Sequence, residues 1–273
     1  MLCGSFFWTL APTGAFAQRP APSPSPTPPS DPCGPIASLV DRPTVTTSPC
    51  TVRPGHAMLE NGWTNTVTTG PGGGNTASYP QSFLRVGTFD PHLEFTFAPP
   101  SFNRSSVGGS LTRGWNDISL GAKYELGYTA KAVWGIGASA SLPTGSRAFT
   151  AGNAQFSGDV NWTYSVSTTW SFAGTVSANA LSAYNAAGIA QSYFACIPSV
   201  VLTASLPQSS SIFVEYAYYS RAAPNSGAKS LIDAGYTRDL GTNLQLDAEY
   251  GDSPTLLNAQ TQHYVGAGLS LLY

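Results

Sequence analysis

Ten charged residues occur in segments where apolar and polar residues alternate, and they are the side chains best suited to act on a solute. Eight are acidic and two are basic: Arg85, Glu94, Asp117, Lys123, Glu125, Asp159, Glu215, Asp233, Asp247 and Glu249. A pore lined by such a set disfavours anions and tolerates cations or neutral solutes. The same residues can instead form ion pairs and hydrogen-bond networks that brace an interior, because buried charges are usually paired. The sequence alone leaves both interpretations open.

Catalytic chemistry has little support in the sequence. The three histidines are His56, His92 and His263, and a Ser–His pair needs the base within hydrogen-bond reach of the nucleophile. The sequence contains no Gly-x-Ser-x-Gly segment, phosphate-binding loop, dinucleotide motif or cluster of metal ligands. We therefore expect neither an enzyme nor a cofactor or metal site. A net charge of −2 also argues against a nucleic-acid binder, which needs a basic surface.

The last eleven residues predict the element that closes the fold. In the segment 263–273, one face carries Val265, Ala267, Leu269, Leu271 and Tyr273, and the other carries Tyr264, Gly266, Gly268, Ser270 and Leu272. A period of two is typical of a strand. A flat apolar edge strand invites pairing with other chains, and a closed barrel removes the edge. The last strand of a soluble β-sandwich is the alternative.

Composition favours strands that cross a membrane. Only 10% of the 273 residues are charged, against about 25% in a typical globular protein. The mean hydropathy is −0.04, and no run of about 18 apolar residues predicts a membrane helix. Alternating segments of about ten residues match tilted membrane strands. We predict strands near 56–68, 80–89, 91–99, 115–127, 131–142, 155–166, 168–179, 191–205, 210–221, 229–240, 243–251 and 261–273.

The predicted fold is all-β: a single transmembrane antiparallel up-and-down β-barrel of about 12 strands, spanning residues 55–273. Short turns are expected at Asp90-Pro91, Ser167-Thr168 and Gly241-Thr242. Longer loops are expected at 69–79, 100–114, 143–154, 180–190, 222–228 and 252–260. In outer-membrane barrels the long loops face the outside of the cell. Both termini would then lie on the periplasmic side of the bacterial outer membrane.

The residues ahead of the barrel divide into three parts. Residues 1–17 are typical of a truncated signal peptide ending in Ala15-Phe16-Ala17, and residues 18–32 of a Pro-rich disordered linker. Residues 33–54 contain Cys33 and Cys50, which we expect to form a disulfide in an oxidising compartment. We expect this segment to lie in the periplasm, on the side of both termini. The roughly 55 residues ahead of the barrel are too few and too proline-rich for a plug domain.

Several short motifs resemble a known family. They include the strand Trp115–Tyr124 (WNDISLGAKY), the Pro-Thr-Gly loop within Leu142–Ser146, the later segments Glu215-Tyr216, Asp233–Tyr236 and Leu246-Asp247, and the closing strand. In this order they resemble the outer-membrane transporter family linked to the meta-pathway of phenol degradation, over roughly residues 55–273. The resemblance implies an outer-membrane barrel that passes small solutes, aromatic or hydrophobic ones among them.

The sequence thus predicts a barrel for passive passage of small solutes. Its expected partners are outer-membrane lipid, a small-molecule solute and the barrel-assembly machinery, which would read the closing strand with Val265, Leu269, Leu271 and Tyr273. The alternative function is a non-conducting structural barrel that acts through its external loops.

Overall fold

The computed structural model describes residues 30–185, 187–254 and 260–273. The expected signal peptide and most of the Pro-rich linker lie outside these residues. The described chain forms one short helix, α1 (Ile36–Leu39), and a single antiparallel sheet. The strands are β1 (Ala57–Thr69), β2 (Gly74–Tyr79), β3 (Phe83–Gly87), β4 (Leu93–Ala98), β5 (Phe102–Val107), β6 (Ser110–Trp115), β7 (Ile118–Tyr128), β8 (Ala132–Leu142), β9 (Gln155–Ser165), β10 (Trp170–Tyr184), β11 (Ala190–Leu206), β12 (Ser210–Tyr219), β13 (Lys229–Asp239), β14 (Leu244–Ser253) and β15 (Thr261–Leu272).

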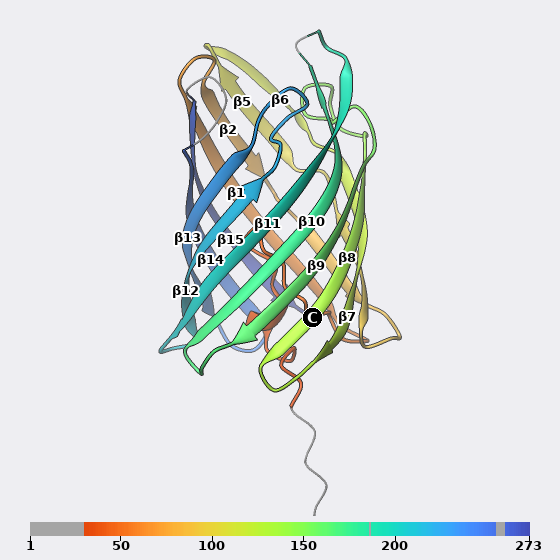
Figure 1. Ribbon diagram of the computed structural model, residues 1–273, viewed down its shortest axis with the longest axis vertical. Helices are drawn as coiled ribbons and strands as arrows, with labels where there is room; N and C mark the ends of the chain where they lie inside the picture. Colours follow the sequence, from red (N-terminus) through yellow and green to blue (C-terminus); the bar gives the residue numbers. More distant parts are fainter. Residues whose placement is uncertain (1–29, 186, 255–259) are drawn as a thin grey trace, which may run out of the picture.

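The sheet closes on itself to form a barrel (Figure 1). From β7 to β15 each strand pairs with the next strand in sequence, and β15 also pairs with β1. This seam runs in register from Met58 opposite Leu272 to Thr69 opposite Thr261. The prediction that the last strand closes a barrel is therefore confirmed. No helix among the described residues is long and apolar enough to cross a membrane.

Fifteen strands fill twelve positions around the barrel, because three positions hold a broken strand. β1 pairs with β2 along its second half and with β3 along its first half. The breaks fall at Pro80 between β2 and β3, at Pro99-Pro100 between β4 and β5, and at Asn116-Asp117 between β6 and β7. Proline cannot donate to a strand ladder, so the first two breaks follow from the sequence. The predicted barrel of about 12 strands is confirmed.

The two ends of the barrel differ. We call the end that carries Tyr273 and the start of β1 the terminus end. Its strands are joined by short turns at 88–92, 129–131, 166–169, 207–209 and 240–243. The other end, here the loop end, has the longer connections 143–154, 185–189, 220–228 and 254–260. The expected long loops at 69–79 and 100–114 were wrong: they are largely β2 and the β5–β6 hairpin. Their Ser-, Thr-, Asn- and Gly-rich strands lack the apolar alternation on which the prediction relied.

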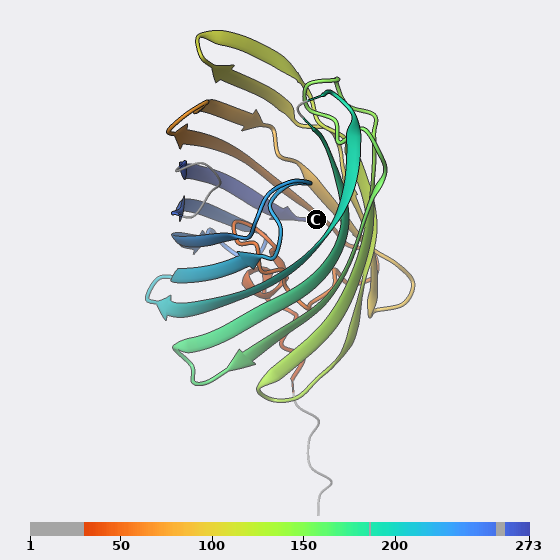
Figure 2. The same ribbon diagram turned by 45° about the horizontal axis from the view of Figure 1, so that its top comes forward.

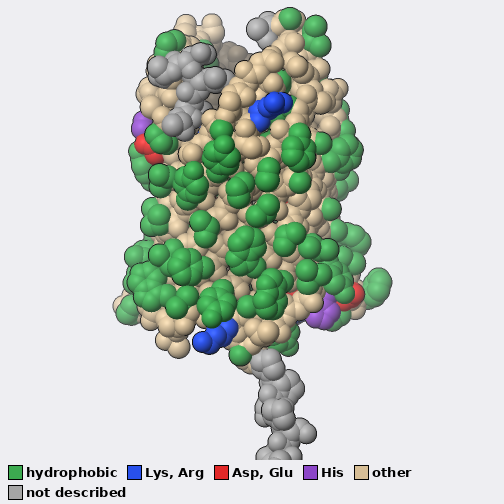
Figure 3. Space-filling view, viewed as in Figure 1, with side chains coloured by type: hydrophobic (Ala, Val, Ile, Leu, Met, Phe, Trp, Pro, Cys, Tyr) green, Lys and Arg blue, Asp and Glu red, His purple; other side chains and the backbone are tan. Residues whose placement is uncertain are grey.

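The outer face of the barrel is apolar. Large apolar side chains are exposed all around it, including Phe95, Val160, Val214 and Leu269. In Figure 3 the charged side chains of the visible face lie only near the two ends of the barrel. In the closing strand, Val265, Leu269 and Tyr273 are exposed, and Leu271 is half-buried. Such a band suits contact with lipid hydrocarbon.

The segment 30–53 lies inside the barrel rather than ahead of it. Figures 1 and 2 show this segment, in red and orange, enclosed by the strands near the terminus end. The expectation that the residues ahead of the barrel form no plug was therefore wrong, and we name residues 30–53 the lumen segment. Composition could not reveal this placement, because it depends on individual hydrogen bonds and ion pairs with the barrel wall.

Candidate functional site

The lumen segment is held together by a disulfide and a small apolar cluster. Cys33 and Cys50 are bonded, as predicted from their spacing, and both are buried. Ile36, Leu39 and Val52 of the segment pack with them and with Met58 and Val133 of the wall. The segment is therefore a compact ring that fits against the inner surface of the barrel.

Arg85 on β3 is the centre of the strongest attachment. Its side chain is fully buried, and its Nε lies 2.8 Å from Glu94 Oε1 on β4. Its Nη1 lies 3.1 Å from Glu60 Oε1 on β1 and donates to the backbone carbonyl oxygen of Leu39. Its Nη2 donates to the carbonyl oxygen of Cys50 at 2.9 Å. One buried guanidinium thus joins three wall strands to two points of the lumen segment.

Lys123 on β7 extends this network to Asp41. Its Nζ donates to Asp41 Oδ1 and Oδ2 at 2.9 and 2.8 Å, and Arg85 Nη1 is 3.5 Å from Asp41 Oδ2. Burial acts to raise the pKa of Asp41, but the positive charges of Arg85 and Lys123 outweigh it and hold the pKa below its ordinary value. Asp41 therefore remains ionised at neutral pH, and it binds the lumen segment to Lys123 and Arg85 of the wall.

On the opposite wall the attachment uses acidic residues. Glu215 on β12 accepts hydrogen bonds from the backbone N–H groups of Val45 at 2.7 Å and Thr46 at 2.6 Å. Arg42 Nη2 lies 3.2 Å from Asp247 Oδ1 on β14. The guanidinium of Arg42 lies over Gly62 and Gly268, where any Cβ would come within 2.5 Å of it. The glycines on the inner face of the seam therefore form a groove for Arg42.

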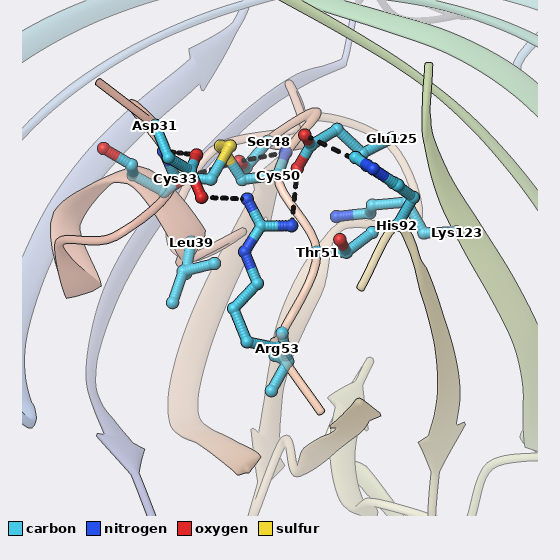
Figure 4. Close-up of a disulfide and its surroundings, with 12 residues drawn as sticks. Asp31, Cys33, Leu39, Ser48, Cys50, Thr51, Arg53, His92, Lys123 and Glu125 are labelled. Atoms are coloured by element: carbon cyan, nitrogen blue, oxygen red, sulfur yellow. Dashed lines mark hydrogen bonds and ion pairs between the residues drawn. A yellow bond between two sulfur atoms is a disulfide. The ribbon is translucent and has the colours of Figure 1, made fainter. Parts of the chain in front are cut away.

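Arg53 ties the segment to the mouth of the terminus end (Figure 4). It pairs with Asp31 at 2.5 Å and with Glu125 of β7 at 3.2 Å. His92 Nδ1 lies 3.4 Å from the same Glu125. Asp31, Cys33 and Glu125 are close enough for one metal ion. However, the sulfur is in the disulfide and Arg53 already balances the carboxylates, so this cluster is an ion-pair network.

The remaining predicted site residues do not touch the lumen segment. Asp159 faces inward and accepts from Asn161 Nδ2 at 2.6 Å. Asp233 is buried and lies directly opposite Glu215 on the neighbouring strand. Glu249 lies against Gly266. Asp117 has a different role, because its two oxygens accept from the N–H groups of Gly145 and Ala151, both at 2.8 Å. It fixes the Pro-Thr-Gly loop.

Sequence reasoning missed several residues that bind the lumen segment. Glu60 is fully buried and accepts from the N–H groups of Asp41 at 3.1 Å and Arg42 at 2.9 Å. The alternation of the first strand could have placed Glu60 on the inner face. Other contacts use neutral side chains: Thr47 Oγ1 donates to Asn161 Oδ1 at 2.7 Å. No composition signal distinguishes such hydroxyl and amide groups.

A cavity of about 310 Å³ remains between the lumen segment and the wall from β8 to β14. Hydroxyl and small apolar side chains predominate on the wall side, among them Thr163, Ser171, Val201, Thr203, Ser205 and Phe213. Arg42 and Lys131 are the charged residues on this lining, and no carboxylate of the described chain borders it. The acidic pore lining that we considered from sequence is therefore not a property of this cavity, whose surface is mostly neutral.

The comparisons with known proteins agree with this architecture. Residues 40–273 match the family model described as "Putative MetA-pathway of phenol degradation". The outer-membrane channel COG4313 of Pseudomonas putida F1 has a TM-score of 0.65 at 10% identity, covering 82% of this chain and 97% of that one. The NanC porin has a TM-score of 0.52 at 8% identity, covering 77% and 98%.

A third similar structure is the translocator domain of the autotransporter NalP from Neisseria meningitidis. Its TM-score is 0.50 at 11% identity, and the match covers 79% of this chain and 88% of that one. None of the curated proteins matches the chain. At these identities the solved structures establish the fold, and the family model establishes the relationship. The chain is an outer-membrane-type β-barrel and belongs to the family described as "Putative MetA-pathway of phenol degradation".

Proposed function

We propose that this protein is a passive outer-membrane channel for small, largely neutral solutes. The observation that carries the proposal is the cavity of about 310 Å³ beside the lumen segment. Its surface combines hydroxyl groups with methyl and aromatic groups, which suits solutes that have a small apolar body and a hydrogen-bonding group. Simple aromatic alcohols fit this description, and strongly charged solutes do not.

The lumen segment limits the size of the solute. A twelve-strand barrel lies between eight-strand barrels that side chains fill and the open sixteen-strand porins. Here the lumen segment occupies much of the terminus-end half, and the cavity lies between this segment and the terminus-end halves of the strands from β8 to β14. Solutes larger than the cavity would require the lumen segment to move.

We further propose that the loop end faces the outside of the cell and the terminus end the periplasm. Longer connections on the outside and short turns inside are the usual arrangement in outer-membrane barrels. Labelling intact cells at a cysteine placed in the 220–228 loop, and separately at a cysteine in the 240–243 turn, tests this orientation. Labelling of the turn alone would contradict it.

Val201 allows a direct test of the passage. It is 6% exposed and lines the cavity, whereas the preceding Val200 is 45% exposed on the outer face of the same strand. We expect Val201→Trp to slow the swelling of proteoliposomes in phenol and small sugars, and Val200→Trp to leave it unchanged. Equal rates in the two variants would show that solutes do not use this cavity.

The alternative function is a closed structural barrel that acts through its external loops. Arg85, Lys123 and Glu215 favour this alternative, because they fasten the lumen segment inside the barrel through ion pairs and hydrogen bonds. Proteoliposomes containing the wild-type protein discriminate the two. Swelling that does not depend on the solute, and is no faster than in empty liposomes, would support the closed barrel.

A further inference from the structure

Two arginines face each other on the outer surface of the β5–β6 hairpin. Arg104 on β5 is directly opposite Arg113 on β6, and both are exposed. Neither has an ion-pair or hydrogen-bond partner among the described residues. Like charges directly opposite on neighbouring strands destabilise a sheet. An anion between them would remove this repulsion.

The register places this arginine pair above a cluster of aromatic rings. Arg104 is two residues nearer the loop end than Phe102, and Arg113 is two residues nearer it than Trp115. Tyr79 and Phe102 have ring centroids 5.7 Å apart, and Phe102 and Trp115 have centroids 5.3 Å apart. Tyr79 and Trp115 are exposed. Aromatic rings at this position mark the boundary between lipid chains and headgroups.

The hairpin edge adds a third positive charge. Trp115 and Ser146 are joined by two hydrogen bonds, from Ser146 N to Trp115 O at 2.8 Å and from Trp115 N to Ser146 Oγ at 2.9 Å. The exposed Arg147 follows Ser146 directly. Three arginines therefore occur at the loop-end rim of one side of a protein whose net charge is −2.

We propose that Arg104 and Arg113 bind a phosphate group of the glycolipid lipid A, with its acyl chains against Tyr79, Phe102 and Trp115. Paired guanidinium groups recognise phosphate through short, charge-assisted hydrogen bonds. We assign the site to a phosphorylated lipid because one surface carries both arginines, which bind phosphate, and aromatic rings, which contact acyl chains. The assignment to lipid A rests on the proposed orientation, in which the loop end lies in the outer leaflet.

The test is a binding titration of the purified full-length protein in detergent with bisphosphorylated lipid A. The variant is Arg104→Gln with Arg113→Gln, and the matched control is Arg238→Gln, an exposed arginine on β13 at the terminus end. We expect the double variant to bind about tenfold more weakly, since it loses two charge-assisted contacts, and the control to bind like the wild type. Dephosphorylated lipid A should bind the wild type as weakly as lipid A binds the double variant.

Three results would overturn the proposal. The first is equal affinity of the wild type and the double variant for lipid A. The second is that the wild type binds dephosphorylated lipid A as tightly as bisphosphorylated lipid A, and the third is displacement of lipid A by inorganic phosphate at equal concentration. The last would indicate a free-anion site. The titration does not measure solute passage, so the lipid site can fail while the channel function stands, and the reverse is also true.

Discussion

Arg42 of the lumen segment forms an ion pair with Asp247 of β14, with 3.2 Å between Nη2 and Oδ1. Asp247 is almost fully buried, with a side-chain exposure of 1%. The guanidinium rests on Gly62 of β1 and Gly268 of β15, which face each other across the seam of the barrel. The segment is thus fastened at the seam itself.

Replacing Arg42 with Ala should loosen the lumen segment. The change leaves Asp247 buried and unpaired, which typically costs about 3–5 kcal/mol. We expect a higher single-channel conductance in planar bilayers, because the segment loses its attachment to this wall. The double variant Arg42→Ala with Asp247→Ala should recover part of the lost stability, since the unpaired charge is gone. A conductance equal to that of the wild type would contradict this role; Asp239→Asn, on the inner face of β13, is the control.

Removing the disulfide should increase the mobility of the lumen segment without opening the barrel. The bond joins residues separated by 17 positions, and closing a loop of that length stabilises it by about 3 kcal/mol in the chain-entropy model. We expect Cys33→Ser with Cys50→Ser to become sensitive to protease within residues 30–53, while the strands stay protected. Cys196→Ser, which removes the free cysteine of the described residues, serves as the control. Equal cleavage in both proteins would show that the wall contacts suffice.

A charge on the outer face of the closing strand should impair folding into lipid. Leu269 is 40% exposed on that face, and an arginine near mid-bilayer costs about 2–4 kcal/mol. Leu269→Arg should lower the free energy of unfolding in vesicles by that amount. Thr261→Arg, at the loop end of the same strand, should cost about 0–1 kcal/mol. Similar values for the two variants would mean that the outer face is not in lipid.

The acidic residues above the lumen segment should make the channel prefer cations. Asp233 lies directly opposite Glu215 on the neighbouring strand, and Glu249 is on the inner face of β14, and a field of one sign attracts counter-ions. We expect the reversal potential in a salt gradient to indicate cation selectivity, and Asp233→Asn with Glu249→Gln to reduce it. Asp252→Asn is the control, because Asp252 pairs with His263. A preference for anions in the wild type would rule out this role.

Strand periodicity was enough to predict the barrel and the two faces of its wall. Alternation placed Leu269 outside, and the charged residues of β7 and β12 on the other face. The sequence also contains the signal for the breaks at Pro80 and Pro99-Pro100, because proline has no backbone N–H group to donate to a neighbouring strand. Asp117 was misplaced because its position in a strand break, where it accepts from Gly145 and Ala151, cannot be told from a strand position by alternation.

The interior could not be predicted, since it depends on pairing between distant residues. Arg42 and Asp247 are 205 positions apart, and Thr46 and Glu215 are 169 apart. Nothing in the local sequence of residues 33–54 distinguishes a free periplasmic segment from one that binds inside the barrel. The structure shows that Arg42 and Arg53 of this segment pair with Asp247 and Glu125 of the wall.

The placement of Arg85 has a consequence for how the protein must assemble. Its guanidinium and the carboxylates of Glu60 and Glu94 are fully buried in the presence of residues 39–50. A barrel that closed without those residues would expose part of this charge network to an empty interior and lose the carbonyl acceptors of Leu39 and Cys50. We therefore expect the lumen segment and the wall to fold as one cooperative unit, because each completes hydrogen bonds that the other needs.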